Sequence, residues 1–253
     1  MKINVWAYFA LLILLLIVLS YIQNWQTHYQ EHFVTPTDIQ YYVIHDPLNQ
    51  EREKNIILQE TKLGKPIRRF DAVMGNKVDL NDLSIFDPKL QNKYNNQNKN
   101  EYGCYLSHFM LIKYLSEQLS SLDRGYTVIF EDDFQIMTDD LEQKIQHAWS
   151  IIEDDKPVDL LFLGHLDTFV GPSYKENLFE VDLQNTRDFA GTHGYVLRNQ
   201  SIPKIMESLY VIDNPIDHKF GKLFHDGQLH ALLMNPTIVD QTPKIVSTIG
   251  QDR

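Results

Sequence analysis

Cysteine and positive charge are both scarce in this chain. Its 253 residues include one cysteine, Cys104, which excludes a disulfide scaffold and a zinc site built from four thiolates. The 23 lysines and arginines stand against 34 aspartates and glutamates, which gives a net charge of −11. Because no basic stripe is present to follow a phosphate backbone, we expect no nucleic-acid partner. An anionic substrate would need a cation to help it bind.

Familiar catalytic motifs and internal repeats are also missing. The sequence has no GxSxG elbow, phosphate-binding P-loop, GxGxxG or HExxH motif. Apolar residues make up 43% of the chain and charged residues 23%, which excludes a disordered chain, a collagen and a coiled coil. A chain of this length can form one α/β domain with a full core.

One long hydrophobic run lies near the N-terminus. Residues 5–22 carry no charge, and as a helix they would span about 27 Å, close to the thickness of a bilayer's hydrocarbon core. A buried core helix is disfavoured because the run would be apolar on every face at the extreme terminus of the chain. No small-x-small cleavage site of a signal peptide follows the run. We therefore predict an uncleaved transmembrane anchor with a short cytosolic tail over residues 1–25, a stem over 26–38 and one domain over 39–253.

The flanking charges predict the orientation of this single-pass anchor. Lys2 precedes the run, and no further lysine or arginine follows until Arg52. Positive charge tends to stay on the cytosolic side, so the domain is predicted on the non-cytosolic, lumenal side of the membrane.

Short apolar runs alternate with segments of helical spacing in the rest of the chain. The predicted strands cover residues 39–44, 69–73, 126–130, 158–163 and 192–197. The predicted helices cover residues 49–62, 103–119, 138–152 and 200–210, and the Asn- and Asp-rich residues 76–100 are predicted as a loop. The alternation favours an α/β fold, a sheet flanked by helices, without fixing the strand order.

The clearest candidate site is Thr127-Val-Ile-Phe-Glu-Asp-Asp133, in which a buried strand runs into three adjacent carboxylates. Ligands of open α/β sheets bind beyond the carboxyl ends of strands. Three adjacent carboxylates repel one another, and a divalent cation such as magnesium, manganese or calcium would relieve that repulsion. A solvated acidic loop or helix cap is the alternative interpretation.

The pair Ser107-His108 invites comparison with a nucleophile and its base. Neighbouring residues on a helix diverge by about 100°, so these two side chains cannot hydrogen-bond to each other as in a catalytic triad. A histidine taken by itself is more often structural than catalytic.

Seven segments, taken in order, resemble glycosyltransferase family 25, the lipooligosaccharide and procollagen galactosyltransferase-like enzymes. The segments are Tyr42-Val-Ile44 with Arg52, Phe70-Asp-Ala-Val-x-Gly75, Gly103-Cys-x-Leu-Ser-His108, Ile129-Phe-Glu-Asp-Asp133, Asp159-Leu-Leu-Phe-Leu-Gly164, Gly191-Thr-His-Gly-Tyr-Val196 and Pro215-Ile-Asp217. The resemblance covers residues 39–250. The chain departs from the family where His45-Asp46 replace Asn-Leu after the first strand, so no nucleobase contact is carried over there.

The resemblance implies a GT-A type nucleotide-sugar fold and an inverting transfer that uses Mn²⁺, with Mg²⁺ as the substitute. Asp133 would be the metal ligand with Asp132 as a second, while Glu131 and Asp132 would face the ribose or the sugar. Asp217 is the first candidate for the catalytic base and Asp188 the second. The other residues expected at the donor are Arg52, Ser107, His108, Gly191, Thr192 and His193.

The leading hypothesis is therefore a membrane-anchored, metal-dependent glycosyltransferase. It would move a hexose, galactose before glucose, from a UDP-sugar to a hydroxyl of a glycan or of a hydroxylated protein side chain. A non-catalytic protein that binds a sugar nucleotide or glycan on the same fold is the alternative, and a metal-dependent hydrolase is a third. UDP-sugar consumption with manganese, with and without an acceptor, separates the first two.

Overall fold

The computed structural model describes residues 39–119, 124–152, 157–165, 169–184 and 189–243. The chain divides into two compact units, residues 1–37 and 38–253, and only the second contains described residues. The predicted anchor over 1–25 and the stem over 26–38 lie outside the described residues. Within the described ranges, no helix has the length and hydrophobicity needed to cross a membrane.

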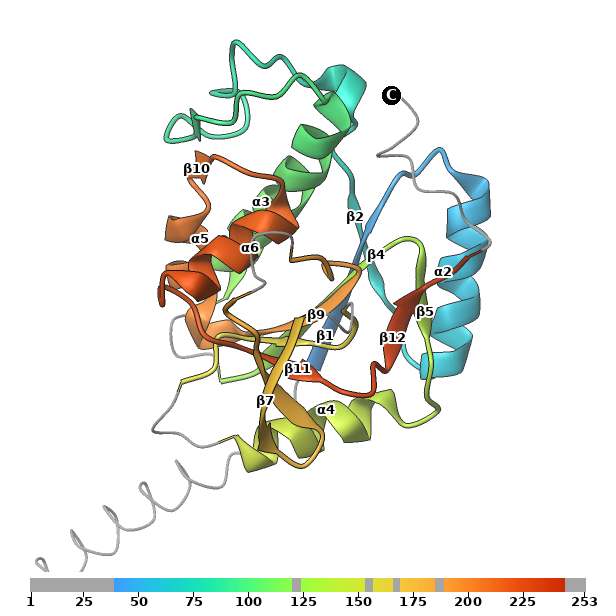
Figure 1. Ribbon diagram of the computed structural model, residues 1–253. Helices are drawn as coiled ribbons and strands as arrows, with labels where there is room; N and C mark the ends of the chain where they lie inside the picture. Colours follow the sequence, from blue (N-terminus) through green and yellow to red (C-terminus); the bar gives the residue numbers. More distant parts are fainter. Residues whose placement is uncertain (1–38, 120–123, 153–156, 166–168, 185–188, 244–253) are drawn as a thin grey trace, which may run out of the picture. The chain divides into compact units, whose positions relative to one another are not determined.

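An eight-stranded mixed sheet forms the centre of the second unit, with the strand order β2-β1-β4-β9-β6-β11-β8-β7 (Figure 1). Strands β2, β1 and β4 are parallel, β9 is antiparallel to both β4 and β6, and β11 is parallel to β6. Strands β8 and β7 complete the sheet as an antiparallel edge. The bounds are β1 Ile39–His45, β2 Arg68–Asp71, β4 Tyr126–Glu131, β6 Leu160–Phe162, β7 Val170–Lys175, β8 Leu178–Val181, β9 Gly194–Arg198 and β11 Ala231–Met234.

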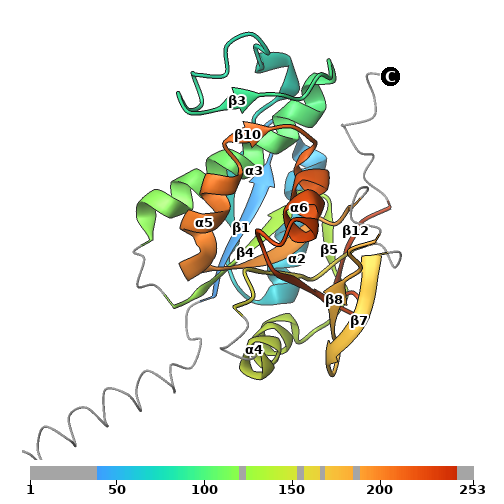
Figure 2. The ribbon, with the colours of Figure 1, turned by 60° about the vertical axis from the view of Figure 1, so that its left-hand side comes forward.

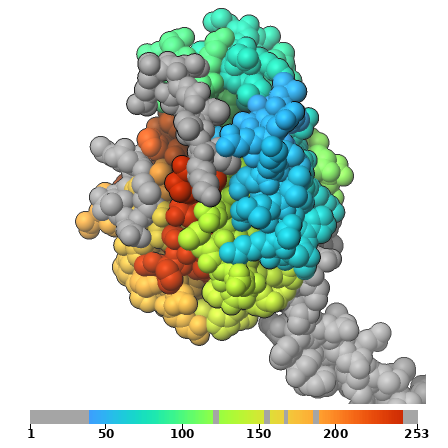
Figure 3. Space-filling view, turned by 90° about the vertical axis from the view of Figure 1, so that its right-hand side faces the viewer, coloured from blue at the N-terminus to red at the C-terminus, as the bar shows by residue number. Residues whose placement is uncertain are grey.

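Two further pairs of short strands lie beside the main sheet. Strand β3, Gln91–Asn92, pairs in parallel with β10, Val211–Ile212. Strand β5, Phe134–Ile136, pairs antiparallel with β12, Val239–Gln241. Strand β5 packs against helix α2, Gln50–Leu63, and β12 lies next to β5. Figure 3 shows the yellow-green part of the chain beside the blue-to-cyan part that contains α2.

Helices cover both faces of the sheet (Figures 1 and 2). One hydrophobic cluster joins one face of the sheet to α3, α5 and α6, and a second joins the other face to α2 and α4. The bounds are α2 Gln50–Leu63, α3 Lys99–Gln118, α4 Leu141–Ile151, α5 Ile202–Ser208 and α6 Ile216–His225, with short 3₁₀ helices η1 Gly75–Lys77 and η4 Asn199–Ser201.

The alternation of side chains along β4 determines what the end of this strand can reach. Ile129 packs in the cluster under α3, whereas Val128 and Phe130 pack in the cluster under α2. Successive side chains of a strand point to opposite faces, so Glu131 continues toward α3 and Asp132 toward α2.

The predicted α/β class is confirmed: a mixed sheet is flanked by helices on both faces. Helix α2 matches its prediction closely, with Asn49 capping its first turn and Gly64 ending it at a φ of 70°. Helix α3 begins at Lys99, four residues before the predicted start, because the Asn98 side chain accepts from the Asn100 amide and caps it. Part of the predicted loop 76–100 therefore forms η1, β3 and the start of α3.

Candidate active site

The ends of several strands bring the predicted site residues to one edge of the main sheet. Strands β1, β2, β4 and β6 share a direction, so their carboxyl ends meet there, and antiparallel β9 begins at the same edge. The segments that follow or precede these strands are His45-Asp46, Ala72–Gly75, Glu131–Asp133, Gly164-His165 and Gly191–His193. Such an edge is where open α/β sheets bind ligands.

Glu131 is held from two elements. Its Oε1 lies 3.2 Å from His108 Nε2 of α3 and accepts a 2.7 Å hydrogen bond from the Thr192 hydroxyl. Burial acts to raise the pKa of Glu131, but the hydrogen bond from His108 and the smaller contribution of Thr192 outweigh it, and the pKa lies below its ordinary value. The carboxylate is therefore ionised at neutral pH.

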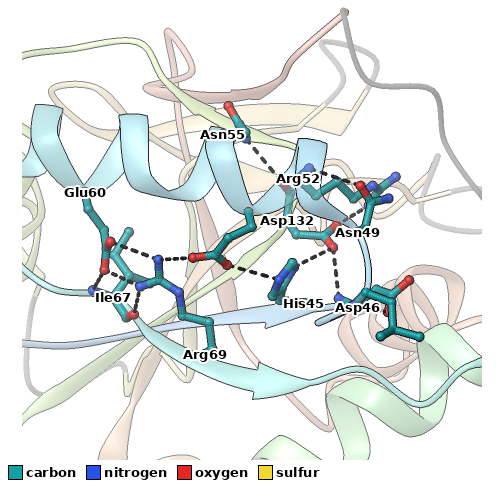
Figure 4. A network of polar contacts seen from close by, with 11 residues as sticks. His45, Asp46, Asn49, Arg52, Asn55, Glu60, Ile67, Arg69 and Asp132 are labelled. Carbon is teal, nitrogen blue, oxygen red and sulfur yellow. Dashed lines mark hydrogen bonds and ion pairs between the residues drawn. The ribbon is translucent and has the colours of Figure 1, made fainter.

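Asp132 points to the opposite face and forms a buried ion pair with Arg52 of α2 (Figure 4). Its second oxygen lies 3.3 Å from His45 Nδ1 and accepts a 3.2 Å hydrogen bond from the Asp46 amide. The Asn55 side chain donates to the Asp132 backbone carbonyl at 3.1 Å. Both carboxylate oxygens of Asp132 are thus engaged by groups that hold β1, β4 and α2 together.

A series of polar contacts links His45 to acidic and basic residues of α2 and β2. His45 Nε2 lies 3.1 Å from Glu53 Oε2, and Arg69 pairs with both Glu53 and Glu60. The hydrogen bond between Arg69 and Glu60 lowers the pKa of Glu60 and raises the pKa of Arg69. The His45-Asp46 pair that departs from the family pattern is therefore part of an ordered polar network (Figure 4).

Asp133 differs from both of its neighbours. It is 5% exposed, yet its Oδ1 has no hydrogen-bond partner among the described residues. Its nearest cation is Arg52, at 3.7 Å from Oδ2. Burial and the charge of Glu131 raise the pKa of Asp133 from 3.8 to about 7, against the opposing effect of Arg52. A buried carboxylate oxygen without a partner in the described part of the chain is chemically suited to bind a divalent cation.

The segment before β9 approaches Gly164 closely. Gly191 has a φ of 153°, and a Cβ added there would lie 2.8 Å from the Gly164 carbonyl oxygen, so only glycine fits. Thr192 then reaches Glu131, and His193 is buried with its Nε2 unpaired within the described part of the chain. Burial lowers the pKa of His193, so this ring is neutral at neutral pH.

Two cavities flank Glu131. The first has a volume of about 130 Å³ and is lined by Arg52, Ala72–Gly75, Ser107, His108 and Asp132. The second has a volume of about 370 Å³ and is lined by Glu101, Gly191–His193, Pro215–His218 and Gln241. Cys104 and Glu131 line both cavities and therefore lie between them.

Asp217 stands in the first turn of α6 and lines the second cavity. Its Oδ1 accepts from the His218 amide at 2.9 Å. Burial raises the pKa of Asp217 above its ordinary value, against the opposing effect of His218. The other predicted base, Asp188, lies outside the described residues.

Ser107 and His108 have separate structural partners. The Ser107 hydroxyl donates to the Gly103 carbonyl at 2.7 Å and accepts from the Val73 amide at 2.8 Å. His108 Nδ1 lies 2.8 Å from the Tyr195 hydroxyl. Both residues line the first cavity, and neither contact joins one to the other.

The structure adds residues that the sequence analysis did not assign to the site. Cys104 lies one helical turn before His108 and shares its face of α3, a spacing that was readable from the sequence. His45 and Tyr195 lie far from their partners along the chain, and no local pattern indicated those contacts.

Fold and geometry together define an α/β protein with a carboxylate-rich site at the carboxyl edge of its sheet and a cavity on each side. The acidic residues 131–133 outnumber the guanidinium of Arg52 that pairs with two of them, so this part of the site is acidic.

Comparison with known families agrees with this class. The family model described as "Glycosyltransferase family 25 (LPS biosynthesis protein)" matches residues 38–220, and the chain belongs to that family. The resemblance drawn from the seven segments is thereby confirmed. A search of curated proteins gave no match.

Solved structures were also compared. One similar structure is described as the "Crystal structure of a glycosyltransferase involved in the glycosylation of the major capsid of PBCV-1". It is 9% identical at a TM-score of 0.35, and the match covers 68% of this chain and 64% of that one. A likeness at this level supports no conclusion about activity.

Proposed function

We propose that this protein is a metal-dependent inverting glycosyltransferase that moves a hexose from a UDP-sugar to a hydroxyl group of an acceptor. Galactose is the favoured sugar and glucose its substitute, and the acceptor is a glycan or a hydroxylated protein side chain. The observation that carries the proposal is the pair of cavities that meet at Glu131, with Asp217 in the wall of the second. Family membership supplies the reaction class.

The donor is assigned to the side of the first cavity, next to Arg52 and the backbone of residues 72–75. A sugar nucleotide carries a diphosphate, and the acidic residues 131–133 repel it. Arg52 is already paired with Asp132, so one guanidinium cannot offset that repulsion. The donor therefore needs a divalent cation to bind.

Mn²⁺, with Mg²⁺ as its substitute, fits Asp133. The unpartnered buried oxygen of Asp133 would itself be a ligand of the ion, and an oxygen ligand suits both Mn²⁺ and Mg²⁺. We assign the holding of the ion to Asp133, whereas Asp132 positions Arg52 and helix α2. When bound, the metal would stabilise the negative charge that develops on the departing nucleotide.

Asp217 is the base in this proposal. Its raised pKa makes its carboxylate a stronger proton acceptor than an ordinary aspartate. As the acceptor oxygen forms its bond to the anomeric carbon, its proton passes to Asp217, and the electrons of the broken glycosyl–phosphate bond leave with UDP. Attack from the face opposite UDP inverts the anomeric configuration.

The test measures UDP release by the full-length chain in detergent. UDP-galactose and UDP-glucose are supplied with Mn²⁺, with and without a panel of glycans and hydroxylated peptides. We expect acceptor-stimulated release, and Asp217→Asn should lower kcat by about 10²- to 10⁴-fold while UDP still binds. Asp226→Asn, at the exposed end of the same helix, is the control and should retain activity.

Two outcomes would contradict the proposal. No turnover of any sugar nucleotide against the whole panel, with UDP binding intact, would favour the non-catalytic binding protein. Full activity in a folded Asp217→Asn variant would remove the base assignment.

The predicted anchor completes the proposed function. Residues 1–25 would hold the enzyme in a membrane as a single-pass protein, with the catalytic domain on the lumenal side. This assignment is supported by the uncharged run of residues 5–22 and by Lys2 before it.

A further inference from the structure

Three side chains of different chemistry meet between the two cavities. A sulfur of Cys104, a ring nitrogen of His108 and a carboxylate oxygen of Glu131 all lie within 4.8 Å of one another. Cys104 and His108 are four residues apart on α3 and so share one face of the helix, whereas Glu131 comes from the end of β4. Helix α3 and the end of β4 therefore bring this sulfur, nitrogen and oxygen close together.

The spacing is close to what a tetrahedral ion requires. Metal–sulfur and metal–nitrogen bonds of roughly 2.3 and 2.0 Å place tetrahedral ligand atoms about 3.3–3.8 Å apart. His108 Nε2 and Glu131 Oε1 are already 3.2 Å apart. The other two separations are no longer than 4.8 Å.

The orientation of His108 also fits a metal ligand. Its Nδ1 lies 2.8 Å from the hydroxyl of Tyr195, which is completely buried. Histidines that bind metals through one ring nitrogen usually hydrogen-bond through the other, and this contact fixes the ring. The Nε2 atom is thereby held toward Glu131 Oε1, at 3.2 Å.

The electrostatic surroundings favour a cation at this point. Burial raises the pKa of the Cys104 thiol, and the charges of Glu131, Asp217, Asp133 and Glu101 raise it further. A divalent ion would offset these negative charges. Cavities on both sides leave room for a further ligand such as water.

We propose that Cys104, His108 and Glu131 form a second metal site that binds a borderline divalent ion, Zn²⁺ before others. A thiolate, an imidazole and a carboxylate together select zinc or cobalt over the oxygen-preferring magnesium and manganese. Metal binding here goes beyond the proposed transfer activity. One consequence rests on the proposed function: a zinc ion between the first and second cavities inhibits sugar transfer.

Cobalt is the probe, because Co²⁺ bound to a thiolate absorbs in the near ultraviolet by charge transfer. The chain contains one cysteine, so this absorption can arise only from Cys104. Full-length protein is titrated with Co²⁺ under reducing conditions and without any sugar nucleotide. We expect the charge-transfer band to saturate at one equivalent, to disappear when Zn²⁺ is added and to persist in excess Mn²⁺.

Two substitutions and one control locate the site. Cys104→Ser should abolish the band, and His108→Gln should weaken Co²⁺ binding by more than about tenfold. His147→Gln, which removes an exposed histidine paired with Glu176, should leave the titration unchanged. Circular dichroism checks that each variant is folded.

The outcomes separate this inference from the proposed function. The inference would be overturned if wild-type protein showed no charge-transfer band, or if a folded His108→Gln variant bound Co²⁺ with unchanged affinity. Neither result would bear on the transferase activity, which the UDP-release assay tests separately. A saturable band in a protein that turns over no sugar nucleotide would support the metal site and contradict only the proposed function.

Discussion

Three consecutive acidic residues have three different environments in this protein. Glu131 is bound by His108 and Thr192, Asp132 is paired with Arg52, and Asp133 keeps one oxygen unsatisfied within the described part of the chain. Glu131 is the last residue of β4 and follows the alternation of the strand toward α3, whereas Asp132 and Asp133 stand in the turn that follows. Substitutions of the two aspartates should therefore have different effects on stability.

Asp132→Asn should lower the free energy of unfolding by roughly 3 kcal/mol, because it removes the carboxylate in closest contact with the buried Arg52 and leaves Asp133 at 3.7 Å. Urea denaturation of metal-free protein at pH 7, followed by circular dichroism, measures the change. If the midpoint of unfolding does not move, Asp132 does not hold α2 to β4, and its oxygens are available for another role.

Asp133→Asn should instead become more stable relative to wild type as the pH rises. The folded pKa of Asp133 is about 7, against 3.8 for the ordinary group, so between these values the unfolded chain releases a proton that the folded chain retains. Wild type therefore loses stability as the pH rises from about 4 to about 7, by at most roughly 4 kcal/mol.

The measurement is urea denaturation of both proteins at about pH 4 and about pH 8 in the presence of EDTA. The asparagine variant carries no charge at this position and should escape the loss. A constant difference between the two proteins across this pH range would show that Asp133 is not the buried, unpaired carboxylate described above.

For individual residues, the sequence predicted the position of the carboxylates, because Glu131, Asp132 and Asp133 directly follow the predicted buried strand. It could not predict their partners, because His45 and Asp132 are separated by 87 residues and meet only through the pairing of β1 with β4. Cys104 was part of a family segment but was given no role, although its four-residue spacing from His108 was readable from the sequence.

Helix α3 is the element on which the site depends most. Its first turns line both cavities, and its packing against the segment after β2 leaves no room for a side chain at Gly103. A Cβ added to Gly103 would lie 2.6 Å from the Val73 carbonyl oxygen and 2.9 Å from the Gly75 amide nitrogen. The glycine of the Gly-Cys-x-Leu-Ser-His segment is therefore required for close packing of the backbone.

Gly103→Ala should force α3 away from residues 73–75 and lower the free energy of unfolding by about 1–3 kcal/mol. Chemical denaturation measures this loss, with Glu117→Ala on the exposed side of the same helix as the control, expected within about 0.5 kcal/mol of wild type. Unchanged stability in Gly103→Ala would mean that the contact between α3 and the β2–η1 segment is loose.

Elements with a strong local pattern were predictable, and those defined by distant partners were not. Helix α2 has an asparagine cap, a glycine stop and a regular interior, and β4 is a continuous apolar run. Strands β3, β10 and β12 are two or three residues long and exist because each pairs with a strand far along the chain. Helix α6 was missed, although its first turn holds Asp217.

The whole molecule combines a net charge of −11 with a site built around acidic residues. The sequence predicted the α/β class but not the strand order, because pairing between distant strands leaves no local signal. That order is what brings β1, β4 and β9 together at the site. It also places carboxylates where we propose that the diphosphate of the donor binds.

Removal of divalent metal should therefore weaken the binding of UDP by at least about tenfold, since the uncompensated carboxylates repel the diphosphate. Isothermal titration of UDP with Mn²⁺, and then with EDTA in place of Mn²⁺, measures the change. Equal affinity under both conditions would exclude the metal-bridged donor site.

The predicted anchor gives a prediction for the full chain. Full-length protein should sediment with membranes and resist extraction at alkaline pH, because residues 5–22 are uncharged and long enough to span the bilayer. A chain that lacks residues 1–25 should remain in the supernatant. Extraction of the full-length protein by alkaline carbonate would contradict the anchor.

The most direct test of the central claim is a crystal structure of the protein with UDP and Mn²⁺. We predict the diphosphate at the carboxyl edge of the sheet beside Glu131, with the metal bound by Asp133 and the uridine on the side of the cavity that Arg52 lines. UDP bound at another surface, with Asp133 still unliganded, would contradict the account.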